Sequence, residues 1–200
     1  MGIICDEEYF RRLINGDREA LRPLMERYAD VLKLYVDGYV HDADMAEEIM
    51  IDAYSRMLVK APRLREGAFK PYLYKTARNL AFKHLKYRSR FMSLDSLAYE
   101  PVDQTHFEEG LLEDERNREL YHNLDRISPE YREALFLVYI EGLSYEEAGA
   151  VMRKSRKQVE NLVFRGKRAM RALMESEEGV DRATAASLNG ISPAALGGGA

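Results

Sequence analysis

Apolar residues recur along most of the chain at spacings of three and four, the period of a helix that buries one face. The longest such stripe comprises Leu21, Leu24, Met25, Tyr28, Leu32, Tyr35, Val36 and Tyr39. Asp44, with Glu47 three residues later, predicts the start of a second helix, which Pro62 ends. Pro71 predicts the first turn of a third helix that runs to about residue 88. No segment alternates with period two, so the pattern predicts an all-α fold.

The helical pattern stops over residues 91–112, where Pro101, acidic residues and scattered polar residues predict a flexible linker. It resumes near Leu112 and continues to residue 174, beyond which Ala, Gly and Ser predict a disordered tail over 175–200. The chain is therefore expected to form two helical domains, over residues 1–90 and 113–174, joined by a flexible acidic linker.

Two capping patterns lie close together in the second domain. Ser144 precedes Glu147 by three residues, and Ser155 precedes Gln158 by the same spacing. Two capped helices with a short break between them predict a helix-turn-helix. Arg153 stands in the break where Gly is common, so we expect the turn to differ in shape. A simple helical hairpin with a hydrated basic face is the alternative, and the two caps favour the helix-turn-helix.

Charge is unevenly distributed along the chain. The formal net charge is −4, which argues against a nucleic-acid partner, but residues 55–90 carry 11 basic residues and one acidic residue. Residues 91–130 carry 3 basic and 11 acidic residues, and residues 153–171 carry 8 basic and one acidic residue. Because salt screens charges over about 8 Å, a polyanion responds to these local blocks and not to the net charge. For any single block taken alone, a solvated charged surface is the favoured interpretation.

Aromatic residues accompany the first basic block. They are Phe69, Tyr72, Tyr74, Phe82, Tyr87 and Phe91. Cations that hold phosphates, together with rings that stack on unpaired bases, are typical of single-stranded DNA binding. Burial in the core explains Tyr72 and Tyr74 equally well. His84 falls on the apolar side of this helix and is interpreted as a structural histidine.

Other classes of function find no support in the sequence. Cys5 is the only cysteine, the four histidines lie far apart, and no nucleophile or phosphate-loop motif is present. We therefore expect no catalytic residue, no metal site and no cofactor. No window of about 18 apolar residues occurs and the N-terminus lacks the pattern of a secretory signal, so we expect a cytoplasmic protein without stable membrane insertion.

Three segments together resemble the extracytoplasmic-function subfamily of sigma-70-type RNA polymerase sigma factors. NGDREALRPLMERYADVLKLYVDGYVHDADMAEEIMIDAYSRM is similar to the polymerase-binding part of sigma region 2. FKPYLYKTARNLAFKHLKYRSR is similar to its promoter-melting part, and ISPEYREALFLVYIEGLSYEEAGAVMRKSRKQVENLVFRGKRAMRALM to region 4. The resemblance implies a factor that directs RNA polymerase to promoters, reading the minus-10 element with region 2 and the minus-35 element with region 4.

The resemblance also implies site residues. The residues implied to bind the core polymerase are Ala46, Glu47, Glu48, Ile49 and Asp52. Ile51 lies among them at a position where many relatives have Gln. Minus-10 binding falls to Arg63, Arg65, Phe69, Lys75, Arg78, Asn79, Phe82, Lys83 and Lys86, with a pocket for a flipped base between the loop 63–69 and Asn79. Minus-35 binding falls to Ser155, Arg156, Lys157, Glu160, Asn161, Phe164, Arg165 and Arg168.

The partners implied are the core polymerase, through the clamp helices of its largest subunit and its flap, promoter DNA in the nucleoid, and an anti-sigma factor. Two alternatives remain open at this point. A free-standing helix-turn-helix regulator would dimerise and bind its operator without the polymerase. An enzyme would need a catalytic constellation, which the sequence does not offer.

Overall fold

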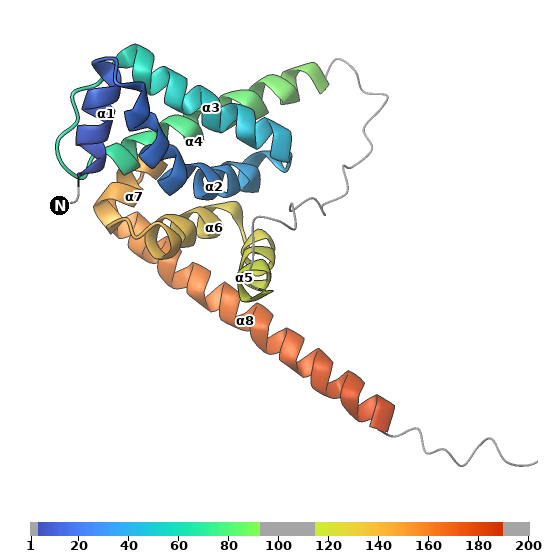
Figure 1. Ribbon diagram of the computed structural model, residues 1–200. Helices are drawn as coiled ribbons and strands as arrows, with labels where there is room; N and C mark the ends of the chain where they lie inside the picture. The colour runs from blue at the N-terminus through green and yellow to red at the C-terminus, as the bar shows by residue number, and fades with distance from the viewer. Residues whose placement is uncertain (1–3, 93–114, 190–200) are drawn as a thin grey trace, which may run out of the picture.

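The computed structural model describes residues 4–92 and 115–189, with side chains over 4–90 and 120–175. Every regular element in these ranges is helical, as the periodicity predicted. The helices form an N-terminal bundle and a C-terminal module that lies beneath it, and the last helix runs far beyond both (Figure 1). The prediction of an all-α chain with two helical regions is thus confirmed.

The N-terminal module consists of α1 (Asp6–Ile14), a short 3₁₀ turn (Arg18–Ala20), α2 (Leu21–Val40), α3 (Ala43–Lys60) and α4 (Phe69–Met92). Helix α2 packs against α3 and α4, and α1 closes one end of the bundle (Figure 1). The predicted stripe of α2 supplies much of the core, including Leu24, Leu32 and Tyr35. Tyr74 of α4 is fully buried as well, which decides in favour of a core role for that ring.

The start of α3 differs from the prediction. The side chain of Asp42, not Asp44, accepts a hydrogen bond from the Met45 backbone N–H at 3.0 Å. Asp42 is available because His41 takes a left-handed conformation, with φ of 50°, and ends α2 only two residues before α3. The connection between α2 and α3 is therefore only two residues long, and Asp44 already lies within the first turn of α3.

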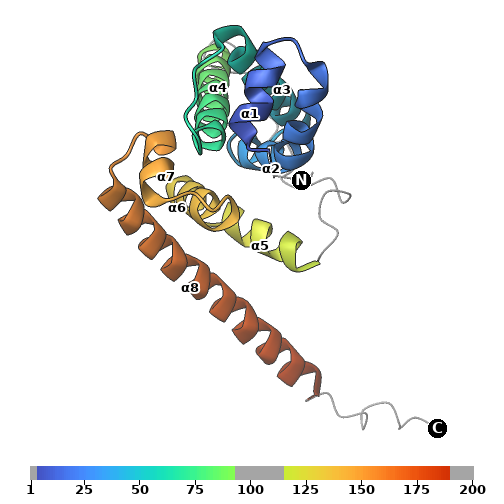
Figure 2. The ribbon, with the colours of Figure 1, turned by 60° about the vertical axis from the view of Figure 1, so that its left-hand side comes forward.

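The C-terminal module consists of α5 (Glu115–Asp125), α6 (Pro129–Leu135), a π-helical turn (Phe136–Ile140), α7 (Tyr145–Met152) and α8 (Arg156–Asn189). Pro129 begins α6, where its missing N–H and fixed φ suit the first helical turn, and Gly142 follows the π-helical turn with φ of 67°. Ser144 and Glu147 form the predicted capping box. Figure 2 shows α6 lying between the N-terminal bundle and α8.

The turn of the helix-turn-helix is formed around Arg153. Its φ of 57° and ψ of 43° place it in the left-handed region, the conformation for which Gly is favoured. The expected change of shape is therefore absent, and Arg153 itself adopts the unfavourable conformation. Gly149 is required here because a Cβ atom at this position would lie 2.6 Å from the carbonyl oxygen of Lys154.

Helix α8 continues to Asn189, whereas the composition predicted a disordered tail from residue 175. Residues 175–189 contain three Glu and three Ala, which have high helix propensity and favour continuation of the helix. Residues 190–200 and most of the predicted linker, over residues 93–114, lie outside the described residues. Among the described helices, none has the length and apolarity needed to cross a membrane.

The two modules pack directly against each other, an arrangement that the sequence did not predict. Helix α7 lies against α4, and α6 lies against α2 (Figures 1 and 2). Tyr35 of α2 contacts Phe136 of the C-terminal module, with ring centroids 5.4 Å apart. The C-terminal module therefore covers part of the N-terminal bundle.

The close approach at Gly149 leads to a prediction about stability. We expect Gly149→Ala to lower the free energy of unfolding by about 1–3 kcal/mol, because the new methyl group forces the backbone at Lys154 to move. Ala150, the next residue, is exposed, and Ala150→Ser should change stability by less than about 0.5 kcal/mol. Urea denaturation followed by circular dichroism measures both. Equal stability of the two variants would contradict the close packing of α7 against the turn.

Candidate nucleic-acid and polymerase interfaces

The first helical turns of α8 form an exposed polar and basic surface. The Ser155 hydroxyl accepts a hydrogen bond from the Gln158 N–H at 3.3 Å, and the Gln158 side chain accepts one from the Ser155 N–H at 2.8 Å. These reciprocal bonds hold the start of the helix. All eight predicted minus-35 residues lie exposed along α8 and its cap: Ser155, Arg156, Lys157, Glu160, Asn161, Phe164, Arg165 and Arg168.

The opposite side of α8 anchors it to the module. Val159 and Val163 are buried, and Gly166 is a contact point, because a Cβ atom there would lie 3.1 Å from the Leu135 side chain. Phe164 faces solvent with 63% of its surface exposed, although it is a large apolar residue. A ring in that position fits contact with an apolar group such as the thymine methyl group.

Helix α4 carries a second basic surface, and it is only partly accessible. Lys75, Phe82, Lys83 and Lys86 are exposed, as are Arg63 and Arg65 in the preceding loop. The Arg78 guanidinium lies over the Phe82 ring, 4.5 Å from its centroid. This stack keeps a cation and an exposed ring side by side, the combination that holds a phosphate and an unpaired base.

Phe69 is wrong as a predicted DNA contact. It is fully buried at the start of α4, and its ring packs against Phe10 and Tyr28 at centroid distances of 5.5 and 5.7 Å. Its backbone N–H donates to the Glu7 carboxylate at 2.8 Å, which supports the start of the helix. Phe69 therefore positions the loop before α4 from within the core.

Arg78 and Asn79 lie where the C-terminal module covers α4. The Arg78 Nε donates to the Glu133 carboxylate at 2.6 Å, and the Arg153 guanidinium donates to the Asn79 side-chain oxygen at 2.8 Å. Burial by itself would lower the pKa of Arg78, but the hydrogen bond to Glu133 and its charge outweigh burial and raise that pKa. Neither side chain is free to contact DNA in this arrangement.

The predicted polymerase-binding residues divide between two faces of α3. Ala46 is fully buried in the bundle and is wrong as a surface contact, because it shares the apolar stripe with Met50 and Ala53. Ile49 is largely buried, at 6% exposure, but it lines a groove between α3 and α4. Glu47, Glu48 and Asp52 are exposed on the other side. Ile51 and Val59 are exposed beside them, at 51% and 87% of their surface. The exposed face of α3 thus combines carboxylates with two uncovered aliphatic side chains.

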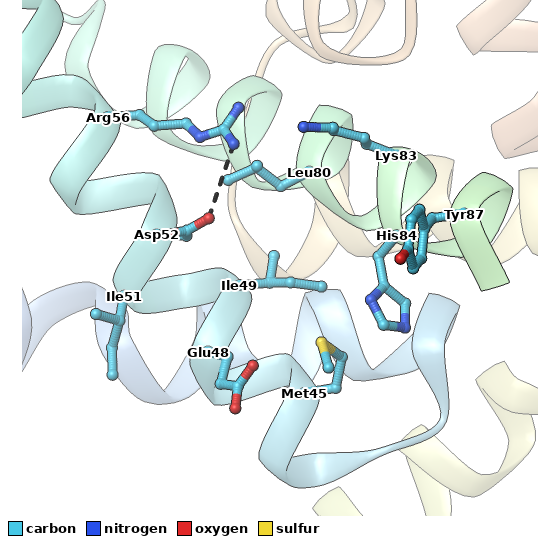
Figure 3. Close-up of a pocket in the computed structure, with 10 residues that line it drawn as sticks. All are labelled: Met45, Glu48, Ile49, Ile51, Asp52, Arg56, Leu80, Lys83, His84 and Tyr87. Carbon is cyan, nitrogen blue, oxygen red and sulfur yellow. Dashed lines mark ion pairs between the residues drawn. The ribbon is translucent and has the colours of Figure 1, made fainter.

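A groove of about 580 Å³ separates this face of α3 from α4. Its walls, drawn in Figure 3, are Met45, Glu48, Ile49, Ile51, Asp52 and Arg56 from α3 and Leu80, Lys83, His84 and Tyr87 from α4. Arg56 pairs with Asp52 at 3.8 Å across one turn. His84 is half-buried in this wall, consistent with its structural interpretation.

The functional residues that the sequence analysis missed are two glutamates at the contact between the modules. Glu133 and Glu141 are 3% and 7% exposed and flank an apolar run of the C-terminal module. Two buried acids at the ends of an apolar segment indicate partners elsewhere in the chain, since a buried charge needs a counter-ion. The two acids at the ends of this apolar run are visible in the sequence, although their burial is not.

The described residues contain no group of three or more histidine, cysteine, aspartate or glutamate side chains placed to hold a metal ion. The only cysteine of the chain, Cys5, is exposed.

Two family models match the chain, and both describe sigma-70 factors. Sigma-70 region 2 matches residues 24–91, and sigma-70 region 4 matches residues 117–170. Region 2 thus covers α2, α3 and α4, while region 4 covers α5 to the first half of α8. Together the matches take in more than half of the chain.

Individual proteins agree with these models. The chain is 27% identical over 176 residues to the RNA polymerase sigma-H factor of Pseudomonas aeruginosa, covering 82% of this chain and 91% of the relative. It is 24% identical over 180 residues to the ECF RNA polymerase sigma-E factor of Escherichia coli K12, covering 84% of this chain and 93% of the relative.

A solved structure shows the same fold. The sigma factor RpoE of Bartonella quintana, in complex with the anti-sigma factor NepR, superposes with a TM-score of 0.62 at 21% identity. The likeness covers 78% of this chain and 96% of that one. With regions 2 and 4 present in order, the chain belongs to the extracytoplasmic-function subfamily of sigma-70-type RNA polymerase sigma factors, which direct promoter-specific initiation of transcription.

Proposed function

We propose that this sigma factor acts through three separate surfaces: the exposed face of α8, the exposed part of α4 with its preceding loop, and the exposed face of α3. The observation that carries this proposal is the exposure of all eight predicted residues at the start of α8. That helix is held at its start by the reciprocal bonds between Ser155 and Gln158, as α7 is by those between Ser144 and Glu147. The protein itself contributes no chemistry, because it selects where the polymerase acts.

The start of α8 is proposed to read the minus-35 element. A recognition helix enters the major groove with its N-terminal residues nearest the base edges, where Arg and Lys bind guanine. Arg156 and Lys157 occupy this position, and Arg156 forms an exposed ion pair with Glu146 at 3.2 Å. Such a pair is weak, so the guanidinium is readily transferred to a base or a phosphate.

The surface of α4 is proposed to bind the minus-10 element as single-stranded DNA. Lys75, Lys83 and Lys86 supply cations and Phe82 supplies a stacking surface. Arg78 and Asn79 join them once the C-terminal module leaves α4. Extruding a base costs a few kcal/mol of stacking, which a pocket at Asn79 and the loop 63–68 would offset.

The exposed face of α3 is proposed to bind the clamp helices of the polymerase. Glu47, Glu48 and Asp52 provide negative charge, and Ile51 and Val59 provide the apolar area that a stable contact needs. Because this face lies apart from the start of α8, polymerase and DNA can bind together. We further propose that the factor works in the cytoplasm on nucleoid DNA, and that an anti-sigma factor binds it, as NepR binds RpoE.

A free-standing helix-turn-helix regulator is disfavoured by the region 2 match and by the apolar, acidic face of α3, for which such a regulator has no use. Run-off transcription from a promoter of the factor, with and without core polymerase and this chain, tests the proposal directly. Initiation that does not depend on the chain would contradict it, and so would an operator footprint of the chain alone.

For the minus-35 surface, we expect Arg156→Ala and Lys157→Ala each to weaken binding of the holoenzyme to a minus-35 duplex by about 1–3 kcal/mol, because a bidentate base contact is lost. Arg171→Ala removes the same charge from an exposed position about four turns further along α8 and should have a much smaller effect. Gel-shift titrations measure both. Identical losses in all three variants would show a general charge effect instead of base recognition.

For the minus-10 surface, Asn79→Ala should slow formation of the open complex while leaving affinity for core polymerase unchanged, because the flipped base loses a polar partner. Permanganate footprinting of unpaired thymines measures opening, and co-purification measures core binding. Ser89→Ala, an exposed position on the same helix, is the control. Normal opening by the Asn79 variant would remove this residue from the pocket.

For the polymerase surface, we expect Glu48→Lys to weaken core binding at least about tenfold, because it places a like charge against a basic partner surface. Glu26→Lys makes the same charge change at an exposed position of α2, away from the groove, and should bind normally. Fluorescence anisotropy of the labelled factor titrated with core polymerase measures both. Equal affinities would place the polymerase contact elsewhere.

A further inference from the structure

Three polar contacts join α4 to the C-terminal module. Arg78 pairs with Glu133, with 2.6 Å between Nε and the carboxylate oxygen. Lys70 Nζ lies 2.8 Å from the Glu141 carbonyl oxygen and 3.3 Å from its carboxylate. Arg153 donates to Asn79 at 2.8 Å. Two of the three therefore occupy residues proposed to bind the minus-10 element.

The two modules are complementary in shape and in hydrogen bonding where they meet. Tyr35 donates its hydroxyl hydrogen to the Glu133 carboxylate at 3.2 Å, next to the Arg78 pair. On the same side of α2, the Arg132 guanidinium donates to the Leu34 carbonyl oxygen at 3.2 Å. It lies so close to Gly38 that a Cβ atom there would be 1.7 Å from the guanidinium carbon. Shape and hydrogen bonding both match across the contact.

Glu133 of the C-terminal module occupies the guanidinium of Arg78, a cation proposed to bind DNA. A carboxylate paired with a guanidinium uses the same fork of donors that a phosphate uses. Glu133 is 3% exposed, so its charge is compensated by Arg78 and not by water. Arg78 cannot pair with Glu133 and with a phosphate at the same time, and the two states of the chain exclude each other.

We propose that the C-terminal module closes over α4 as an intramolecular inhibitor. In this closed form Glu133 holds Arg78 of the minus-10 surface, and Glu141 secures the contact through Lys70, until the polymerase or DNA separates the modules. This inference rests on the proposed minus-10 role of α4. Lys75, Lys83 and Lys86 stay exposed in the closed form, so closure blocks the part of the surface at Arg78 and Asn79 while leaving general attraction for DNA. If one chain in ten is open, affinity for single-stranded DNA falls about tenfold.

Closure is measured by the distance between spin labels in the full chain. Labels at Arg22→Cys in α2 and Ala150→Cys in α7, both exposed positions, report on the two modules after Cys5→Ser removes the native thiol. We expect one narrow distance distribution for the free factor and a longer, broader distribution after addition of core polymerase. A broad distribution in the free factor would overturn the proposal.

The charge of Glu133 is then removed. Glu133→Gln leaves Arg78 buried without a counter-charge, which favours the open form. We expect the distance distribution to broaden. We also expect the affinity of the free factor for a single-stranded oligonucleotide to rise about tenfold, because losing one charge-assisted hydrogen bond shifts the equilibrium toward the open form by about that factor. Glu130→Gln, one helical turn away, removes the same charge from an exposed pair with Lys154 inside the C-terminal module and should change neither quantity.

Glu141→Gln is a second variant expected to open the contact, because it removes the ion pair with Lys70. Circular dichroism verifies that each variant is folded. Opening without a gain in oligonucleotide affinity would overturn the inhibition, and so would opening by the Glu130 variant alone. Core-dependent run-off transcription by the unaltered chain is a separate readout. Absence of core-dependent transcription would contradict the proposed function. An open free factor that still supports transcription would contradict only the inhibitory contact.

Discussion

The side chain of Tyr35 connects the two halves of this protein. Its ring, fully buried, touches Tyr74 of α4 at a centroid distance of 5.0 Å and Phe136 of the C-terminal module at 5.4 Å. Its hydroxyl group donates to Glu133, and burial raises its pKa well above the ordinary value, so the group stays protonated and remains a donor. The apolar contact brings the modules together, and the hydrogen bond directs the buried carboxylate toward Arg78. The ring and its hydroxyl group thus lie at the centre of the contact that brings Glu133 to Arg78.

The consequence for function is a conflict between folding and DNA binding. The proposed minus-10 role requires Arg78 to be exposed in the working state, whereas the same guanidinium pairs with the buried Glu133 when the modules pack. Ion pairs of this kind contribute little net stability, because the desolvation of both charges nearly cancels their attraction. Such an ion pair fixes the geometry of the contact, but its separation requires little free energy. This property suits a contact between modules that must separate before DNA binds.

The surfaces proposed for polymerase and for minus-35 DNA avoid this conflict. The exposed carboxylates of α3 and the polar start of α8 lie outside the packed contact, so they are presented in the closed form as well. Binding of the polymerase to α3 does not require the modules to separate first. Separation can therefore follow binding, and the minus-10 surface would become complete only in the holoenzyme.

The sequence alone determined the helical class, the order of the helices, the two caps of the helix-turn-helix and the exposed residues of α8. These depend on local periodicity and on hydrogen bonds between residues three apart, such as Ser144 with Glu147. Tertiary structure alone decided that Phe69 and Ala46 face the core, because charge and resemblance do not tell which side of a segment is turned inward. It also decided the pairing of Arg78 with Glu133, 55 residues apart. No local rule encodes that pair, since it arises only when two separately predictable modules bury apolar rings against each other.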